Sequence, residues 1–211
     1  MVQPRRFPPL TTALIALNIV AFMVEWWLDK KTNFRVTRYG ALSLTGLHLG
    51  YYWQFITFQF LHAGVLHLVL NCWGIYVFGP PIEAVLGKSR LALLYFLSGV
   101  AGGALQVGAS VLSDKQFGGQ VVGASAGVFG LVAAFTTLFP TAQMTLLLFF
   151  VIPLRMTANR MLTVAGVITA VGIMYPDLLL GKHVKVAHAA HLGGLVAGLI
   201  LIRLFMRRFR S

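Results

Sequence analysis

The sequence predicts an all-α, polytopic membrane protein that folds as a bundle of six transmembrane helices. Three observations support this fold class: 58% of the 211 residues are hydrophobic, only 10% are charged, and the apolar residues lie in long runs. Because a helix needs about 20 mostly apolar residues to cross a bilayer, we expect a single membrane domain over residues 1–211 with spans at 10–27, 57–79, 91–113, 125–139, 157–175 and 186–206.

The first span is long enough to cross the membrane, and Val24-Glu25-Trp26-Trp27 lacks the small residues of a signal-peptide cleavage site. The connection that follows, residues 28–56, is rich in Leu, Tyr and Trp. Since Trp and Tyr prefer the headgroup region, we expect this connection to lie partly embedded in the outer leaflet. Met144–Ile152 is apolar but too short to cross, so we expect it near the membrane interface, ending at Pro153.

The net charge of +12 raises the possibility of nucleic-acid binding, but the 17 Lys and Arg residues are spread over loops and tails rather than gathered in one patch. They fit membrane topology and lipid contact better. Of the basic residues, the side with both termini holds Arg5, Arg6, Lys88, Arg90, Arg155, Arg160, Arg203, Arg207, Arg208 and Arg210, against seven on the other side. The positive-inside rule therefore places both termini in the cytoplasm, with a bacterial cell (inner) membrane as the expected location.

Three polar positions fall at similar depth in the second, fourth and sixth spans, which all run from outside to inside. At ~1.5 Å per residue, Ser125 lies ~21 Å above Phe139, His67 ~18 Å above Gly79 and His191 ~18 Å above Arg203. In a hydrocarbon core of ~30 Å, the three residues lie within about two residues of one another in depth. We therefore expect these three side chains to meet near the outer face.

Ser125 lies in Gly123-Ala124-Ser125-Ala126-Gly127 at the start of the fourth span. One interpretation is a packing face, because small residues four apart let membrane helices approach closely. The other is a serine nucleophile at a helix N-terminus, where glycines admit a substrate and free N–H groups can bind an oxyanion. The motif by itself does not decide between them.

His191 is the candidate base. It is followed by Gly194 and Gly198, which should let the sixth span pack closely against a neighbour, and a fourth-span neighbour would bring the imidazole within hydrogen-bond reach of Ser125. The alternative is a histidine that makes an ordinary interhelical hydrogen bond, although ionisable groups inside a membrane are functional candidates by default. Glu83 and Asp177 lie at positions from which they could not orient the base. We therefore expect a Ser–His dyad rather than a triad.

His67 and Asn71 share one face of the second span because they are four residues apart. Both can donate hydrogen bonds, and such donors aimed at an oxyanion are each worth about 3–4 kcal/mol; polar contacts between helices are the alternative. His62 lies about 140° around the same helix from His67 and is expected to support the site or fix a loop.

A metal site is the competing interpretation of these histidines. His188 and His191, together with His67, could ligate a metal in a membrane enzyme or transporter. Against this, the spans supply no acid to orient the ligands, and the His-Glu-x-x-His pattern is absent. We therefore expect neither a metal nor a cofactor.

The ordered set His62-x4-His67-x3-Asn71, Gly123-x-Ser125-x-Gly127 and Ala190-His191-x-x-Gly194-x3-Gly198 resembles the rhomboid intramembrane serine proteases. The resemblance covers about residues 50–200. It implies a six-helix serine protease, a hydrolase that is surrounded by membrane lipid. Its expected substrates are transmembrane proteins, which it would cut near the outer membrane face.

By position, the resemblance makes Ser125 the nucleophile and His191 its base. His67, Asn71 and the Ser125 backbone N–H would form the oxyanion hole. His62, Gly123, Gly127, Gly194 and Gly198 would support the site. Residues 28–56 correspond to a half-embedded first loop, and the loop before His191, with the top of the fifth span, corresponds to a movable gate.

One departure lies at Gln54, where the family often has Arg after Trp; we expect weaker anchoring of the first loop. A non-catalytic relative that binds transmembrane clients without cutting them is the remaining alternative.

Overall fold

The computed structural model describes residues 8–32, 35–148, 152–175, 178 and 186–207. Six of its helices follow the order of the six predicted spans: α1 (Pro9–Lys31), α5 (Val65–Leu86), α6 (Lys88–Leu112), α8 (Ser125–Leu138), α9 (Ala158–Met174) and α10 (His188–Arg207). By length and composition α1, α5, α6 and α10 can each cross a membrane, while α8 and α9 are shorter apolar helices. The predicted helical membrane fold is confirmed.

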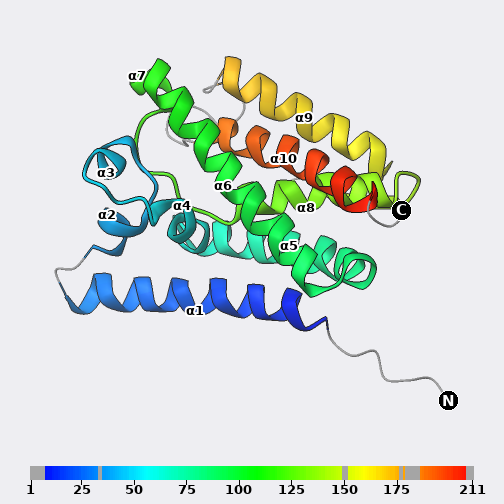
Figure 1. Cartoon of the computed structure of the whole chain (residues 1–211), viewed down its shortest axis with the longest axis horizontal. Helices are drawn as coiled ribbons and strands as arrows, with labels where there is room; N and C mark the ends of the chain where they lie inside the picture. Colours follow the sequence, from blue (N-terminus) through cyan, green and yellow to red (C-terminus); the bar gives the residue numbers. More distant parts are fainter. Residues whose placement is uncertain (1–7, 33–34, 149–151, 176–177, 179–185, 208–211) are drawn as a thin grey trace.

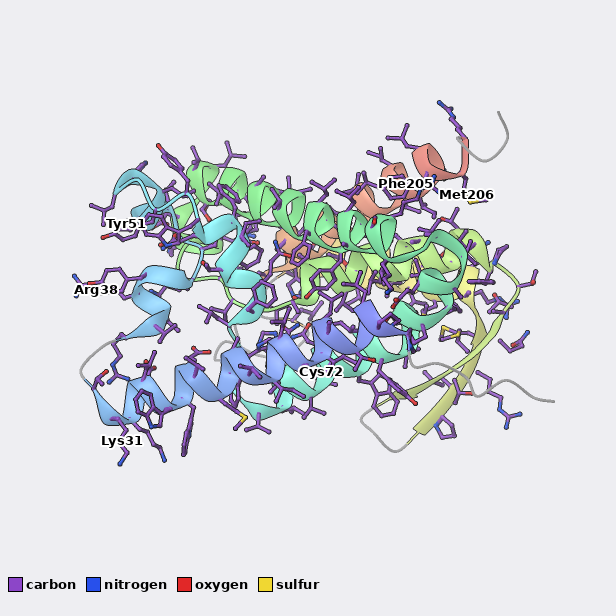
Figure 2. The ribbon with its side chains drawn as sticks, turned by 60° about the horizontal axis from the view of Figure 1, so that its bottom comes forward. Lys31, Arg38, Tyr51, Cys72, Phe205 and Met206 are labelled. Carbon is purple, nitrogen blue, oxygen red and sulfur yellow. The ribbon has the colours of Figure 1, made fainter. Side chains whose placement is uncertain are left out.

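The long helices alternate in direction (Figure 1). Helices α1, α6 and α9 run one way through the bundle, and α5, α8 and α10 run the other way, so the latter three begin toward the same end. Figure 2 shows Lys31, Arg38 and Tyr51 at this end and Phe205 and Met206 at the opposite end. We call the end that carries Lys31, Arg38 and Tyr51 the outer end, after the orientation that the sequence predicts.

Helix α8 is the innermost helix of the bundle. Ten of its 14 residues are buried, and it packs against α5, α6 and α10. The approach is close because small residues face one another: a Cβ at Gly130 would lie 2.2 Å from the Ser98 hydroxyl of α6, and one at Gly198 of α10 would lie 2.6 Å from the Gly130 carbonyl oxygen. Both distances are too short for any side chain, so glycine sets the spacing of the helices around α8.

The predicted start of the second span is wrong. Residues expected to open that span instead form two short helices, α4 (Gln54–Thr57) and η1 (Phe58–Phe60), and α5 begins only at Val65, after Gly64. Leu61, the residue after η1, is extended at φ −88° and ψ 150°. The apolar run continues through this break, and for that reason hydropathy alone could not find it.

The predicted end of the second span is wrong as well. Helix α5 continues through Pro80 and Pro81 to Leu86. Two prolines remove two backbone donors, but the turn beyond them buries Ile82, Glu83 and Leu86, and this burial favours a continued helix. Gly79 therefore does not end the helix. The depth of His67 in the membrane was counted from Gly79, so it was counted from the wrong residue.

Glu83 joins α5 to the start of α1. Its carboxylate accepts hydrogen bonds from the backbone N–H groups of Leu10 (3.0 Å) and Thr11 (2.8 Å) and from the Thr11 hydroxyl (2.7 Å). A helix N-terminus has unpaired N–H groups and favours an adjacent negative charge. Glu83 is thus a structural cap for α1.

The apolar segment after α8 forms a hairpin. Strands β1 (Gln143–Leu148) and β2 (Ile152–Thr157) pair antiparallel, with Leu147 opposite Pro153. The expectation that this segment ends at Pro153 is wrong, because Pro153 lies within β2. A proline is tolerated there since each strand of a two-stranded ribbon has an unpaired edge.

The connection between α1 and α5 is folded rather than loose. It contains α2 (Val36–Gly40) and α3 (Leu44–His48), and Leu42 pairs with Val121 in an isolated antiparallel bridge. Gln54 is fully buried, accepts the Ser43 N–H (3.2 Å) and donates to the Tyr39 carbonyl (3.2 Å), so it does anchor this connection. That the anchoring is weaker than with an arginine remains a prediction. Embedding of this connection in the outer leaflet remains a prediction.

Candidate active site

Ser125 is the first residue of α8 and is placed there by a sharp turn. Gly123, two residues earlier, has φ +124°, a conformation that side chains rarely adopt, and its N–H donates to the Phe58 carbonyl (2.8 Å). A Cβ at Gly123 would lie 2.7 Å from the His67 ring and 3.7 Å from the Ser125 hydroxyl. Glycine is therefore required both by the turn and by the approach of His67.

Ser125 and His191 meet between α8 and α10. The His191 Nε2 lies 2.8 Å from the Ser125 hydroxyl oxygen, which is the geometry of a nucleophile and its base. The contact follows from the helix packing: a Cβ at Gly194 would lie 2.1 Å from the Ala126 carbonyl oxygen. The sixth span does pack against the fourth, as the sequence predicts.

Two further contacts hold His191 in place. Its ring stacks on Phe129, with centroids 4.4 Å apart and planes inclined by 7°. Its helix is fixed by Gln106 of α6, whose side-chain oxygen accepts the Ala190 N–H (3.2 Å) while its amide donates to the Phe117 carbonyl (2.9 Å). Neither Phe129 nor Gln106 was predicted as a site residue from the sequence. A buried glutamine in an apolar helix was the available signal for Gln106; Phe129 had none.

His67 faces Ser125 from α5, with its ring against Gly123. The Ala63 N–H points to the Nδ1 of His67 at 3.4 Å. A nitrogen that accepts a hydrogen bond carries no proton in neutral imidazole, so this contact favours a proton on Nε2. Nε2 is one of the two ring atoms that lie nearest Gly123, so a hydrogen-bond donor lies beside Gly123, two residues before Ser125.

Asn71 is buried one turn along the same helix. Its amide nitrogen donates to the His67 carbonyl at 2.9 Å, so the contact that the structure gives Asn71 is within its own helix rather than with Ser125. An amide nitrogen has two protons, and the second is not used by this bond. The predicted shared face of His67 and Asn71 is present in α5.

His62 lies beside His67, but not by the geometry expected. Since α5 begins at Val65, His62 is not on the helix and the calculated rotation does not apply. Its ring instead meets the His67 ring edge-on, with centroids 5.2 Å apart, and its Nδ1 lies 3.2 Å from the Phe60 carbonyl. Glu25 of α1 was not predicted as a site residue; its carboxylate accepts the backbone N–H of His62 at 3.4 Å.

The remaining predicted residues pack around this group. A Cβ at Gly127 would lie 2.9 Å from the Tyr95 ring, so the packing interpretation of the Gly123–Gly127 pair also has a basis. His188 is buried with its ring centroid 6.1 Å from that of His191, and it packs on Gly172. Within the described ranges, His, Cys, Asp and Glu form no group of three that could hold a metal ion. The predicted gate before His191 lies largely outside those ranges.

Comparisons with known proteins agree on one family. The family model of the Rhomboid domain matches residues 49–208. The chain is 33% identical over 138 residues to the protein named "Putative rhomboid protease YdcA" of Bacillus subtilis (strain 168), covering 62% of each chain. It is 28% identical over 231 residues to "RHOMBOID-like protein 1" of Arabidopsis thaliana, covering 96% of this chain and 54% of that one.

A third relative is "RHOMBOID-like protein 5" of Arabidopsis thaliana, 30% identical over 162 residues, which cover 77% of this chain and 47% of the relative. The matched regions thus span 47–62% of the length of these three relatives.

Proposed function

This chain belongs to the rhomboid family of integral, multi-pass membrane proteins, and on that premise we propose that it is an intramembrane serine endopeptidase. Ser125 is its nucleophile and His191 its general base. The observation that carries the proposal is the 2.8 Å contact between the His191 Nε2 and the Ser125 hydroxyl. One of its relatives bears a protease name, which supports the same reaction class.

The reaction needs two proton transfers by one imidazole. As the Ser125 oxygen bonds to the scissile carbonyl carbon, its proton moves to the His191 Nε2. The C–N bond then breaks, and the amine leaves with that proton. Water attacks the resulting ester in the same way: His191 takes a proton from the water and returns it to the Ser125 oxygen as the acid product leaves. No cofactor takes part in these steps.

In the part of the chain that the structure describes, an aromatic ring and a neutral amide hold His191 and its helix in place. Stacking on Phe129 fixes the plane of the ring, and the Gln106 bond to the Ala190 N–H holds the first turn of α10. In a triad the acid holds the imidazole in one orientation; here packing supplies that constraint. This supports a dyad as the complete proton-transfer unit.

Three donors are proposed for the oxyanion. The His67 Nε2–H is directed to the serine because Nδ1 faces the Ala63 N–H. The second amide proton of Asn71 is the next donor, and the backbone N–H of Ser125 is the third, since a first-turn N–H has no partner within its helix. Each donor of this kind is worth about 3–4 kcal/mol in the transition state.

The substrates are proposed to be transmembrane proteins cut near the outer membrane face. A helical peptide bond keeps its carbonyl in the hydrogen-bond ladder, so the substrate must unwind locally, and small or helix-breaking residues near the cleavage site would favour this. The backbone N–H and C=O of Val121 are both hydrogen-bonded to Leu42. The opposite edge of this extended segment is therefore left for a substrate strand.

The proposed orientation has both termini in the cytoplasm, with a bacterial cell membrane as the expected location. The excess of Lys and Arg on the side of the termini supports it. Helix α1 begins and α10 ends at the end of the bundle opposite the outer end (Figure 1), which is consistent with an even number of crossings.

The test is cleavage of a single-span substrate by the full chain in liposomes. Wild type should cut, and Ser125→Ala and His191→Ala should each reduce the rate by about 10⁴-fold or more, with helix content and thermal unfolding unchanged. A non-catalytic binder of transmembrane clients would retain the substrate without turnover. Cleavage by the Ser125→Ala variant at the wild-type rate would exclude the proposed mechanism.

A further inference from the structure

A cavity of about 660 Å³ opens at the outer end of the molecule, beside the proposed active site. Its walls are the outer part of α1, the segment that leads into α5, and the extended segment before Ser125. The residues that matter here are Glu25 and Asp29 of α1, His62, and Val122. None of them belongs to the Ser125–His191 pair.

The cavity is within reach of a bound substrate. Val122 is three residues before Ser125, and the His62 ring lies edge-on to the ring of His67, which in turn faces Gly123. An extended chain advances about 3.3 Å per residue. A substrate that runs along the free edge of the Val122 segment would therefore place a side chain in this cavity about three to five residues from the bond that is cut.

The polar groups that line the cavity and lack partners are hydrogen-bond acceptors. The His62 Nδ1 lies 3.2 Å from the Phe60 carbonyl, which can only accept, so Nδ1 carries the proton and Nε2 has a free lone pair. Nε2 is buried and unpartnered, on a residue that is 3% exposed. Glu25, 8% exposed, accepts the His62 N–H with one oxygen. Its other oxygen has no hydrogen bond to the part of the chain that the structure describes.

The other charges around the cavity are already engaged. Asp29 accepts the Val36 N–H (3.2 Å) and lies 3.8 Å from the Arg35 guanidinium. The Lys30 ammonium lies over the Trp26 ring, 4.3 Å from its centroid. Because the His62 Nε2 is itself buried, the Glu25 carboxylate is the acceptor left for a ligand that brings hydrogen-bond donors and a positive charge.

We propose that this cavity is a specificity pocket that takes a lysine or arginine side chain of the substrate, with the Glu25 carboxylate as its acceptor. The proposal rests on the proposed protease function. The volume is large enough for either side chain, and the aromatic walls supplied by Phe22 and Trp26 would cover the methylene groups of the long stem. The pocket would thus select substrates with a basic residue at one fixed distance from the cleavage site.

The test is a residue scan on a single-span substrate, with the full chain reconstituted in liposomes. Lys is compared with Met, which has a similar length and no charge, at each of the five positions on either side of the scissile bond. A charge-assisted contact predicts that wild-type kcat/KM favours Lys by about tenfold at one position three to five residues from the bond. Glu25→Gln should reduce this ratio to within about twofold while the Met substrate is still cut.

Asp29→Asn is the matched control, because Asp29 lines the same cavity but is already bonded, and this variant should keep the Lys preference. Glu25→Lys should favour Glu over Lys at that same position. If Glu25→Gln is poorly folded, the comparison of Lys with Met substrates by the wild-type protein decides whether the pocket exists.

A wild-type ratio within twofold at every position, with cleavage intact, overturns the pocket and leaves the protease function standing. A preference for Lys over Met that persists in a folded Glu25→Gln variant overturns the pocket as well. If wild type cuts none of the substrates, the function fails, and the pocket fails with it.

Discussion

The substitution Gly194→Ala tests whether helix packing holds the proposed dyad together. A Cβ at this position would lie 2.1 Å from the Ala126 carbonyl oxygen and 2.8 Å from the Ala126 carbonyl carbon. Both are backbone atoms of α8 and cannot rotate away. An ordinary contact needs about 3.4 Å, so α10 must move from α8 by roughly 1.3 Å.

This displacement acts directly on the Ser125–His191 contact. Gly194 is one turn from His191 and Ala126 is adjacent to Ser125, so the hydrogen bond of 2.8 Å would lengthen to about 4 Å, beyond hydrogen-bond range. A misplacement of about 1 Å in an active site can reduce the rate by about 10²-fold. The steric conflict should also lower the free energy of unfolding by about 1–3 kcal/mol.

The assay measures kcat/KM on a single-span substrate in liposomes, together with the unfolding midpoint in mild detergent. Gly108→Ala is the matched control: Gly108 lies in α6, and no atom lies within 4 Å of the position its Cβ would take. The control should keep full activity and gain slightly in stability. Activity of Gly194→Ala within twofold of wild type would refute the link between glycine packing and the dyad.

Three further outcomes are expected. A fluorophosphonate should label Ser125 alone, and the rate of labelling should collapse in His191→Ala, as followed by mass spectrometry; labelling at full rate in that variant would contradict the dyad. Glu83→Gln should lower the free energy of unfolding by about 1–2 kcal/mol, because the α1 cap loses its charge, while kcat/KM stays within twofold. Gln54→Leu should cost about 1–3 kcal/mol in the same unfolding measurement, because the Ser43 N–H loses its acceptor; an unchanged midpoint would show that water replaces the amide.

The order of the apolar helices was predictable because each forms one long apolar run, although α8 and α9 are shorter than the other four. Helix ends were less predictable. At α5 the break at Leu61–Gly64 lies within apolar sequence, and the prolines at 80 and 81 lie within a helix that the burial of Ile82 and Leu86 sustains. Both departures depend on contacts with other helices, which hydropathy does not contain.

The contact between Ser125 and His191 was predictable from spacing and depth. His67 lies against Gly123, two residues before Ser125, although its depth reference was wrong. The agreement survived because Ser125 and His191 lie on helices that the sequence delimits well, α8 and α10. By contrast, Phe129, Gln106 and Glu25 act through tertiary contacts. The amide in an otherwise apolar helix is a signal for Gln106, but an apolar aromatic ring and an acid near a helix end carry no pattern that marks them in a sequence.

The same contacts hold the bundle and align the proposed chemistry. Gly194 and Gly198 bring α10 onto the backbone of α8 at the Ser125 end and one turn further along. A flexible pair of helices would need a carboxylate to hold the imidazole, since hydrogen bonding would then be the only constraint on the ring. With the α8–α10 spacing fixed by glycine and the ring plane fixed by Phe129, the His191 Nε2 is held 2.8 Å from the Ser125 hydroxyl. Loosening the helix contact should therefore reduce activity before it unfolds the protein.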